Sequence, residues 1–370
     1  YRKYILNHMR NYYFAIGAMS GTSADGIDIS IIKTDGLNYF EPISNFSIPY
    51  GYDLRKRIIN FSKFFNNKNS HFNIILLEEL ITKKYIEGIS KIIKKSKIKS
   101  ESIDVIGLHG QTIFHDPKNS ISLQLIDAKK VAKYFKTKVV SNFRQKDISH
   151  GGEGAPLVPV FHALLKKYIK VKESAMFINI GGISNITYVP NSGELIAFDT
   201  GPGMCLLDDY VSSNSNNQFD LNGRFSNKGN VHNLTLKKSM SDKFFKKNYP
   251  KSLDRNYFSI KNYSNLSFYN ACATISMFTV LSIYEGIKKI DLDCRFIYLM
   301  GGGSRNLFIL KELSKLINGE IKSINNLNLS DNYIESQAFA YLGIRSLKKL
   351  SISYPNTTGI NVANTGGDII

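Results

Sequence analysis

Four glycine-rich segments carry the residues that could bind phosphate. They are Gly21–Gly26, Gly151–Gly154, Gly181–Gly182 and Gly301–Gly303, and each is expected to follow an apolar strand. Glycine lets the backbone approach a ligand closely and point successive N–H groups at an anion. One such segment alone is explained as well by an ordinary turn, but four of them favour phosphate binding.

The glycine segments do not fit the common nucleotide fingerprints. A Walker loop needs Gly-Lys-Ser/Thr at the start of a helix, and a dinucleotide site needs G-x-G-x-x-G between strand and helix. After Gly26 the apolar residues Ile27, Ile29 and Ile31 alternate, so the first turn is expected to close a β-hairpin. Phosphate contacts from a hairpin turn imply a different class of nucleotide site.

A second hairpin pattern begins about 160 residues after the first. "AMFINIGGISNITYV" from residue 175 is an apolar strand, a turn at Gly181 and Gly182, and a second strand. This repetition predicts two related domains that each begin with a hairpin. Two hairpin turns and a later Gly-Gly-Gly turn resemble the nucleotide site of the sugar kinase, actin and heat-shock ATPase superfamily.

The surrounding pattern predicts alternating strands and helices, and therefore α/β layers with mixed sheets. A buried strand at Val105 and Ile106 is expected to open into a polar loop, and another strand is expected to end at Asp199, before a Gly-Pro-Gly turn. Further strands and helices are expected near 13–33, 40–50, 52–64, 73–98, 121–135, 160–168, 267–287, 294–317 and 330–350.

The length and charge of the chain limit the possible domain organisation and binding partners. A chain of 370 residues is expected to form two domains. The net charge of +18 comes from lysines spread over many segments, and the densest run, 83–102, has the isoleucine spacing of a solvated amphipathic helix. Without a zinc-finger, RNP-like or arginine-rich motif, no nucleic-acid partner is expected.

The remaining composition favours the cytoplasm. Three distant cysteines, Cys205, Cys272 and Cys294, suit a reducing compartment, and no apolar run reaches the length of a membrane span. The basic start followed by a short apolar stretch could be read as a signal peptide, but the apolar part continues directly into the first hairpin. Met9 could be the native start.

A series of motifs resembles the anhydro-N-acetylmuramic acid kinase family over residues 14 to about 360. The motifs occur in the family's order and spacing: "MSGTSADGIDIS", "GLHGQTIFHDP", "NFRQKDISHGGEGAPLVPVFH", "NIGGISNIT", "FDTGPGMCLLDDY", "PKSLDRNYF", "MGGGSRN" and "ESQAFAYLGIRSL".

The resemblance implies a fold and a reaction. The fold would be two actin-like (ribonuclease H-like) α/β domains with an ATP-binding cleft, the first formed by 1–141 and 351–370 and the second by 142–350. With ATP, magnesium and water, the enzyme would open 1,6-anhydro-N-acetylmuramic acid and phosphorylate its 6-oxygen, giving N-acetylmuramic acid 6-phosphate in cell-wall recycling. Members of the family are typically homodimers, so a homodimer is expected.

The resemblance also implies phosphate contacts. The residues facing ATP would be Gly21, Thr22, Ser23, Asp25, Gly26, Asp28, Gly181, Gly182, Gly301, Gly302, Gly303 and Asn306. A carboxylate does not face a phosphate favourably, so Asp25 or Asp28 is expected to act through magnesium or its water molecules. An ordinary Asx turn is the alternative for Asp25.

The "DTGPG" motif supplies the expected catalytic residue. Asp199 matches the family's catalytic aspartate and would be the general base that activates water at the anomeric carbon. Glu335 is a candidate second carboxylate that helps hold the water. A helix N-terminal glutamate, favoured by the helix dipole, is the alternative for Glu335.

Substrate contacts are expected from His109, Gln111, Arg144, Gly201 and Gly203. A planar guanidinium suits a carboxylate or a phosphate, so Arg144 could bind either. A structural histidine and an interdomain salt bridge are the alternatives for His109 and Arg144.

The chain departs from the family pattern at several positions. Glu153, Met204 and Asn142 stand where the family has glutamine, asparagine and aspartate, and Asp254 and Ile126 replace glycines. Glu153 would add negative charge near phosphates unless Lys146 or a cation offsets it. Two other functions therefore stay open: a related kinase for another sugar or acid, and a non-catalytic ATP-binding regulator.

Overall fold

The computed structural model describes residues 12–63, 71–327 and 329–370. Met9 and the basic start lie outside this part of the chain. The chain forms two compact units, which are described separately. Unit 1 comprises Tyr1–Tyr168, Tyr333–Pro355 and Ile360–Ile370, and unit 2 comprises Ile169–Asn332 and Asn356–Gly359.

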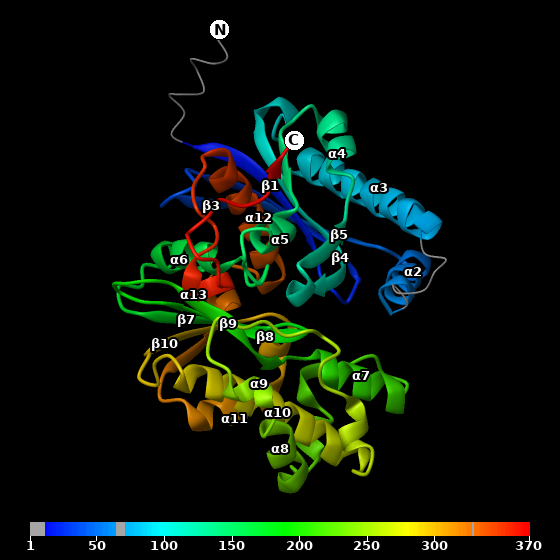
Figure 1. Ribbon diagram of the computed structural model, residues 1–370, viewed down its shortest axis with the longest axis vertical. Helices are drawn as coiled ribbons and strands as arrows, with labels where there is room; N and C mark the ends of the chain where they lie inside the picture. Colours follow the sequence, from blue (N-terminus) through cyan, green and yellow to red (C-terminus); the bar gives the residue numbers. More distant parts are fainter. Residues whose placement is uncertain (1–11, 64–70, 328) are drawn as a thin grey trace. The chain divides into compact units, whose positions relative to one another are not determined.

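Unit 1 is built on one mixed sheet (Figure 1). Its strands are β1 (Tyr13–Ser20), β2 (Gly26–Thr34), β3 (Phe40–Pro49), β4 (Ile103–Asp116), β5 (Ile121–Leu125), β6 (Val139–Ser141) and β12 (Asp368–Ile369). Its helices are α2 (Tyr52–Lys63), α3 (His71–Ser96), α4 (Ala128–Phe135), α5 (Phe143–Ile148), α6 (Pro159–Tyr168) and α12 (Ile334–Leu347). The sheet order is β12-β6-β4-β1-β2-β3, with β5 paired to β4.

Alternation along the strands gives this sheet two different faces. Ile16, Ala18 and Ile29 point into a core that α3 completes. Gly17 and Gly107 lie under α12, where a Cβ on either would come within 2.1 Å of the helix backbone. Glycine at these two positions therefore lets α12 pack directly against the sheet.

Unit 2 repeats the same plan. Its strands are β7 (Ala175–Ile180), β8 (Ile183–Val189), β9 (Ile196–Pro202), β10 (Phe296–Met300) and β11 (Glu320–Ser323). Its helices are α7 (Cys205–Asn214), α8 (Asn233–Met240), α9 (Lys243–Lys246), α10 (Phe268–Lys288) and α11 (Leu307–Leu316), and a short helix α13 (Pro355–Thr358) lies near the end of the chain. The sheet order is β11-β10-β7-β8-β9.

The two sheets share strand order and direction. In each, three antiparallel strands (β1-β2-β3, β7-β8-β9) are followed by two strands parallel to the first (β4 and β6, β10 and β11). The core of unit 2 lies between β7 and the helices α10 and α11. The expected fold class, two related α/β units with mixed sheets, is confirmed.

The compact units differ from the expected domain division in three segments, of which 356–359 belongs to unit 2 instead of the first domain. Residues 142–168 and α12 pack with the first sheet rather than the second. The reason for α12 is its close contact with β1 through Gly17, which the sequence separates from it by more than 300 residues.

Two expected strand ends are wrong. β4 continues to Asp116 because its later residues pair with β5, so the polar stretch after Ile106 is strand rather than loop. β9 continues past Asp199 to Pro202 because Gly201 and Pro202 pair with β8. Asp199 therefore lies inside a strand.

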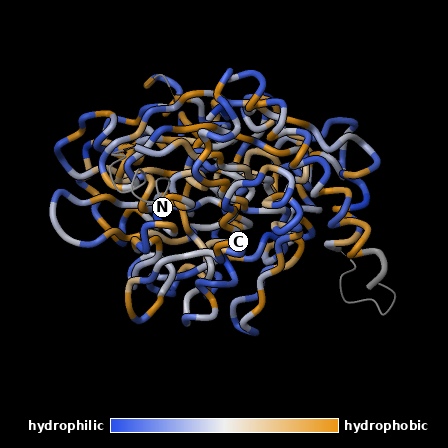
Figure 2. Tube along the Cα trace, turned by 90° about the horizontal axis from the view of Figure 1, so that it is seen from above, coloured by the Kyte–Doolittle hydropathy of each residue, from blue (hydrophilic) through white to orange (hydrophobic). Residues whose placement is uncertain are grey.

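Hydrophobic stretches alternate with hydrophilic ones along the trace (Figure 2). None of the helices within the described residues is both long enough and apolar enough to cross a membrane.

Candidate active site

The first glycine turn joins β1 to β2 in unit 1. The N–H of Ala24 donates to the carbonyl of Gly21 at 3.1 Å, and Ala24 takes the left-handed conformation with φ of 53°. Ala24 is buried, whereas Thr22 and Ser23 are exposed. The turn thus anchors itself through Ala24 and presents two hydroxyl side chains to solvent.

Hydrogen bonds from buried polar groups support this turn. Gln111 donates from Nε2 to the Gly21 carbonyl at 3.0 Å, and the hydroxyl of Ser20 lies 2.9 Å from that of Tyr85. Gln111, for which a substrate contact is expected, supports the turn with its amide group. Its Oε1 atom is buried and has no hydrogen-bond partner within the described chain.

The two glycines that bound the first turn serve different purposes. A Cβ on Gly26 would lie 2.4 Å from the Ile48 carbonyl oxygen, so β3 requires glycine there. A Cβ on Gly21 would meet nothing closer than Ser23 Oγ, at 3.8 Å. The space at Gly21 is therefore available to a ligand, while Gly26 is explained by packing.

Two aspartates follow the turn. Asp25 is exposed and pairs with Arg55 at 2.9 Å, while Asp28 accepts a 2.5 Å hydrogen bond from Ser47. Burial raises the pKa of Asp28 despite the Ser47 bond, and the negative charge of Asp25 raises it further. A cation would relieve this repulsion.

The number of carboxylates here, two, fits a magnesium ion that is bound to a nucleotide. No group of three or more metal-binding side chains is found among the described residues. Magnesium bound to a nucleotide needs only one or two carboxylates, since phosphates and water supply its other ligands.

His109 and Arg144 contact each other in unit 1. Arg144 Nε donates to His109 Nε2 at 2.8 Å and Nη1 donates to the Gly154 carbonyl at 3.0 Å, while His109 Nδ1 lies 2.9 Å from the Gly110 carbonyl. Burial, and then the Arg144 charge, lower the pKa of His109 well below its usual value. The neutral imidazole is thus held at both nitrogens, which favours the structural alternative for His109.

The segment Gly151–Gly154 does not follow a strand, contrary to expectation. It follows α5, and the Gly154 N–H donates to the buried Asp147 carboxylate at 2.7 Å. Glu153 within it is half-buried. Asn142 lies before α5 with φ of 59° and donates to Asp368 at 2.7 Å, where an aspartate would instead meet a like charge.

Glu335 lies in the first turn of α12 and is half-buried. Two residues earlier, the Tyr333 hydroxyl lies 3.0 Å from Ser47 Oγ, which in turn donates to Asp28. The start of α12 and Asp28 are therefore linked on one face of the unit 1 sheet.

The second glycine turn joins β7 to β8 in unit 2, and the Gly-Pro-Gly segment binds it. Gly203 N–H donates to the Gly182 carbonyl at 2.9 Å, and Met204 N–H donates to the Gly181 carbonyl at 2.8 Å. A Cβ on Gly203 would lie 2.2 Å from the Gly181 oxygen, and one on Gly201 would lie 2.6 Å from the Ser282 Cβ. Gly201 and Gly203 are thus required by packing, whereas a Cβ on Gly181 would meet nothing closer than 3.5 Å.

The third glycine segment packs beside the second turn. A Cβ on Gly301, whose φ is 80°, would lie 2.4 Å from Asn179 Oδ1, and one on Gly303 would lie 2.3 Å from Ile180 Cγ2 and 2.9 Å from Met204 Sδ. Gly302 has open space around it. Unit 2 therefore brings together three of the motifs that the sequence separates.

Asn306 caps α11 rather than lining an open surface. Its Oδ1 accepts from the N–H groups of Phe308 and Ile309 at 3.0 and 3.2 Å, and the side chain is buried. The Nδ2 atom has no hydrogen-bond partner within the described residues.

Asp199 lies at an irregularity in β9. Asn185 pairs with Asp199 and Ser184 with Gly201, so Thr200 is an extra residue in the ladder, a β-bulge. Bulges re-aim neighbouring side chains and are frequent beside active sites. Leu253 N–H donates to Asp199 Oδ2 at 2.8 Å, so the buried carboxylate is held at the bulge.

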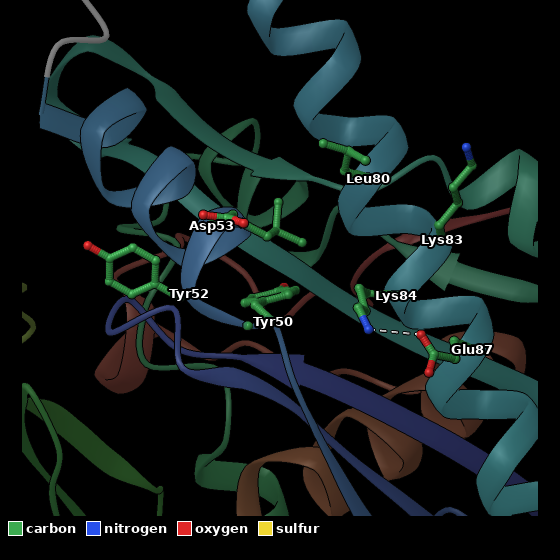
Figure 3. Close-up of a pocket in the computed structure, with 9 residues that line it drawn as sticks. Tyr50, Tyr52, Asp53, Leu80, Lys83, Lys84 and Glu87 are labelled. Carbon is green, nitrogen blue, oxygen red and sulfur yellow. Dashed lines mark hydrogen bonds and ion pairs between the residues drawn. The ribbon is translucent and has the colours of Figure 1, made fainter.

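A pocket of about 350 Å³ lies beside the first turn in unit 1 (Figure 3). Tyr50, whose N–H donates to the Asp25 carbonyl, connects it to the turn. Two charges on its wall, Lys84 and Glu87, form an ion pair of 2.9 Å. The lining residues are Tyr50, Gly51, Tyr52, Asp53, Leu54, Leu80, Lys83, Lys84 and Glu87.

Sequence reasoning missed the side chains that support the site. No role is expected for Arg55 or Lys251 from the sequence, although Lys251 lies in the quoted "PKSLDRNYF" motif. An alternating pattern cannot indicate them because their partners, Asp25 and the segment around Asp199, are distant in sequence. The lysine in that motif is the one available signal.

Two solved structures are distant matches. Component A of (R)-2-hydroxyglutaryl-CoA dehydratase from Acidaminococcus fermentans has a TM-score of 0.49 at 11% identity, covering 91% of this chain and 100% of that one. A ROK family glucokinase from Streptomyces griseus has a TM-score of 0.41 at 11% identity, covering 89% and 99%.

Sequence comparisons are far stronger. The family model for anhydro-N-acetylmuramic acid kinase matches residues 12–370. The enzyme of that name from Pelagibacter ubique is 36% identical over 98% of this chain and 99% of its own length, and that from Bradyrhizobium diazoefficiens is 34% identical over 96% and 98%. The chain belongs to the anhydro-N-acetylmuramic acid kinase family.

Proposed function

We propose that this chain carries out the reaction of its family, the ATP-dependent opening and phosphorylation of 1,6-anhydro-N-acetylmuramic acid during cell-wall recycling. The observation that carries the proposal, beside the family match, is the buried Asp199 carboxylate at a bulge of β9, in the unit that also gathers three glycine motifs. The product is N-acetylmuramic acid 6-phosphate.

Asp199 acts as the general base. It takes a proton from a water molecule as the water oxygen bonds to the anomeric carbon, and the bond from that carbon to the 6-oxygen breaks. The freed 6-oxygen takes the γ-phosphoryl group, and ADP leaves. The backbone bond from Leu253 to Asp199 Oδ2 supports this role because it fixes the carboxylate without protonating it.

The glycine turns bind the phosphates. Phosphoryl transfer depends chiefly on positioning and charge stabilisation, which backbone N–H groups supply. The vacant space over Gly21 and Gly181 supports close approach of an anion to each turn. Thr22 and Ser23 add exposed hydroxyls beside Gly21.

Magnesium would be held by Asp25 or Asp28, directly or through water, and would neutralise charge on the phosphates. The repulsion between these two carboxylates supports the assignment. Glu335 remains the candidate for holding the attacking water, and Arg144 the candidate for binding the lactyl carboxylate. Gln111 and His109 then act by supporting the turn and Arg144.

The other two functions considered, a kinase for a different sugar or acid and a non-catalytic ATP-binding regulator, are not favoured by the comparisons. Over nearly its whole length, this chain is about one third identical to kinases that share one name.

We further propose a cytoplasmic homodimer that binds no nucleic acid, with the two compact units acting as the two actin-like domains. The three cysteines are buried thiols, which suits a reducing compartment. The homodimer is inferred from the family resemblance, and sedimentation of the purified protein tests it.

Product analysis tests the proposed function. The protein is mixed with ATP, magnesium and either the anhydro sugar, ring-opened N-acetylmuramic acid, N-acetylglucosamine or glucose, and products are identified by mass spectrometry. We expect the anhydro sugar to be converted to muramic acid 6-phosphate at the highest rate of the four substrates. We expect this activity to be lost when a chelator is added. Faster phosphorylation of glucose would support a different sugar kinase, and nucleotide binding without any product would support a regulator.

A further inference from the structure

A short segment of unit 2 is bound to the edge of the sheet at Asp199. β9 is the edge strand, and residues Lys251–Leu253, here termed the strap, lie beside it. The N–H of Asp199 donates to the Lys251 carbonyl at 3.0 Å, and the N–H of Leu253 donates to Asp199 Oδ2 at 2.8 Å. The strap therefore holds both the backbone and the carboxylate of Asp199.

The side chain of Lys251 anchors the strap. Although charged, Lys251 is only 6% exposed. Its Nζ donates to the Phe244 carbonyl at 3.2 Å and lies 4.1 Å from the centre of the Phe244 ring and 5.7 Å from that of Phe198. These contacts join the strap to α9 and to β9 itself.

A buried ammonium needs an explanation, because burial favours the neutral amine and an apolar side chain would cost less there. Burial lowers the pKa of Lys251 from 10.5 to about 8, the charges of Lys289 and Lys247 lower it, and the charge of Asp199 raises it. Lys289 donates to the carbonyls of Phe245 and Lys247. Asp199 is thus the negative charge that favours the Lys251 ammonium.

We propose that Lys251 is a positioning residue for Asp199: its ammonium fixes the strap on Phe244, the strap orients the carboxylate, and the nearby positive charge keeps that carboxylate ionised. This inference rests on the proposed role of Asp199 as the general base. It adds a residue that acts through Asp199 without touching the substrate.

The first test is the pH dependence of turnover in the wild type and in Lys251→Arg, which keeps its charge at all working pH values. Wild-type kcat is expected to fall as the pH rises through about 8, where Lys251 loses its proton. Lys251→Arg is expected to retain its activity to higher pH. The same alkaline decline in both proteins would overturn the inference.

The second test is Lys251→Met, with Lys289→Met as the control, which removes a nearby lysine charge but keeps the contact of Lys251 with Phe244. Lys251→Met is expected to lower kcat on the order of tenfold or more, because the base is misplaced, while KM for ATP is unchanged. The acid limb of kcat/KM is expected to move to higher pH because Asp199 loses a favourable charge. If folded Lys251→Met has the same kcat as the wild type and the same acid limb of kcat/KM, the inference is overturned.

Failure here is distinguishable from failure of the proposed function. If Asp199→Asn abolishes turnover while both Lys251 variants behave as the wild type, only the role of Lys251 is wrong. If Asp199→Asn retains turnover, the general-base assignment itself is wrong.

Discussion

The two hairpin turns close sheets of the same strand order, yet they offer a ligand different chemistry. The turn of unit 1 spans Gly21–Asp25 and carries exposed hydroxyls and a carboxylate. The turn of unit 2 is only Gly181 and Gly182, and the backbone of Gly203 and Met204 binds its carbonyls. One turn can contribute side chains and a metal ligand, whereas the other contributes backbone alone.

The carboxylates of the two units, Asp28 and Asp199, also have different surroundings. Asp28 accepts a hydrogen bond from the Ser47 hydroxyl beside a second aspartate, and burial raises its pKa. Asp199 is held by a backbone N–H at a bulge. We infer that unit 1 supplies charge for the nucleotide and unit 2 supplies the group that moves a proton.

The largest effect is expected from Asp199→Asn. An amide cannot take a proton from water, so turnover should fall on the order of 100-fold or more. ATP binding should be unchanged, because the phosphate turns are untouched. Steady-state kinetics and nucleotide titration measure the two quantities, and near-normal turnover would remove Asp199 from the base role.

A smaller effect is expected from Gly21→Ala and Gly181→Ala. Both positions have room for a methyl group within the protein, so stability should be nearly unchanged. If phosphates approach both turns closely, each methyl group should weaken ATP binding by about tenfold, or ~1.4 kcal/mol. Calorimetric titration with ATP measures this loss.

The control for these variants is Gly26→Ala, whose Cβ would lie 2.4 Å from the Ile48 carbonyl oxygen. It should destabilise the protein by about 1–3 kcal/mol through overpacking. If only one of the two turn variants weakens ATP binding, the phosphates approach only that hairpin turn closely.

The smallest effect concerns the pH dependence of stability at Asp28. Because its pKa is raised on folding, the folded protein keeps this proton at pH values where the unfolded chain has released it. The free energy of unfolding of the wild type should therefore fall, relative to Asp28→Asn, as pH rises from about 4. Denaturant titrations between about pH 4 and pH 7 measure this difference, and a constant difference would contradict it.

The sequence predicted the repeated hairpins well because period-two alternation and glycine turns are local signals. It did not predict that α12 packs against β1, because that contact depends on Gly17 and on residues far along the chain. The continuation of β9 beyond Asp199 depends on pairing with β8 and on the bulge at Thr200, which no local pattern indicates. Motif resemblance named Asp199, but only the structure revealed the strap that holds it.

The central claim is that one active site adds water to the anhydro sugar and phosphorylates the oxygen that is released. Reaction of the anhydro sugar with ATP and magnesium in oxygen-18 water, followed by mass spectrometry of the sugar product and its fragments, tests it most directly. Muramic acid 6-phosphate with one label, at the anomeric hydroxyl, is expected. Unlabelled sugar phosphate, or label found only in inorganic phosphate, would contradict it.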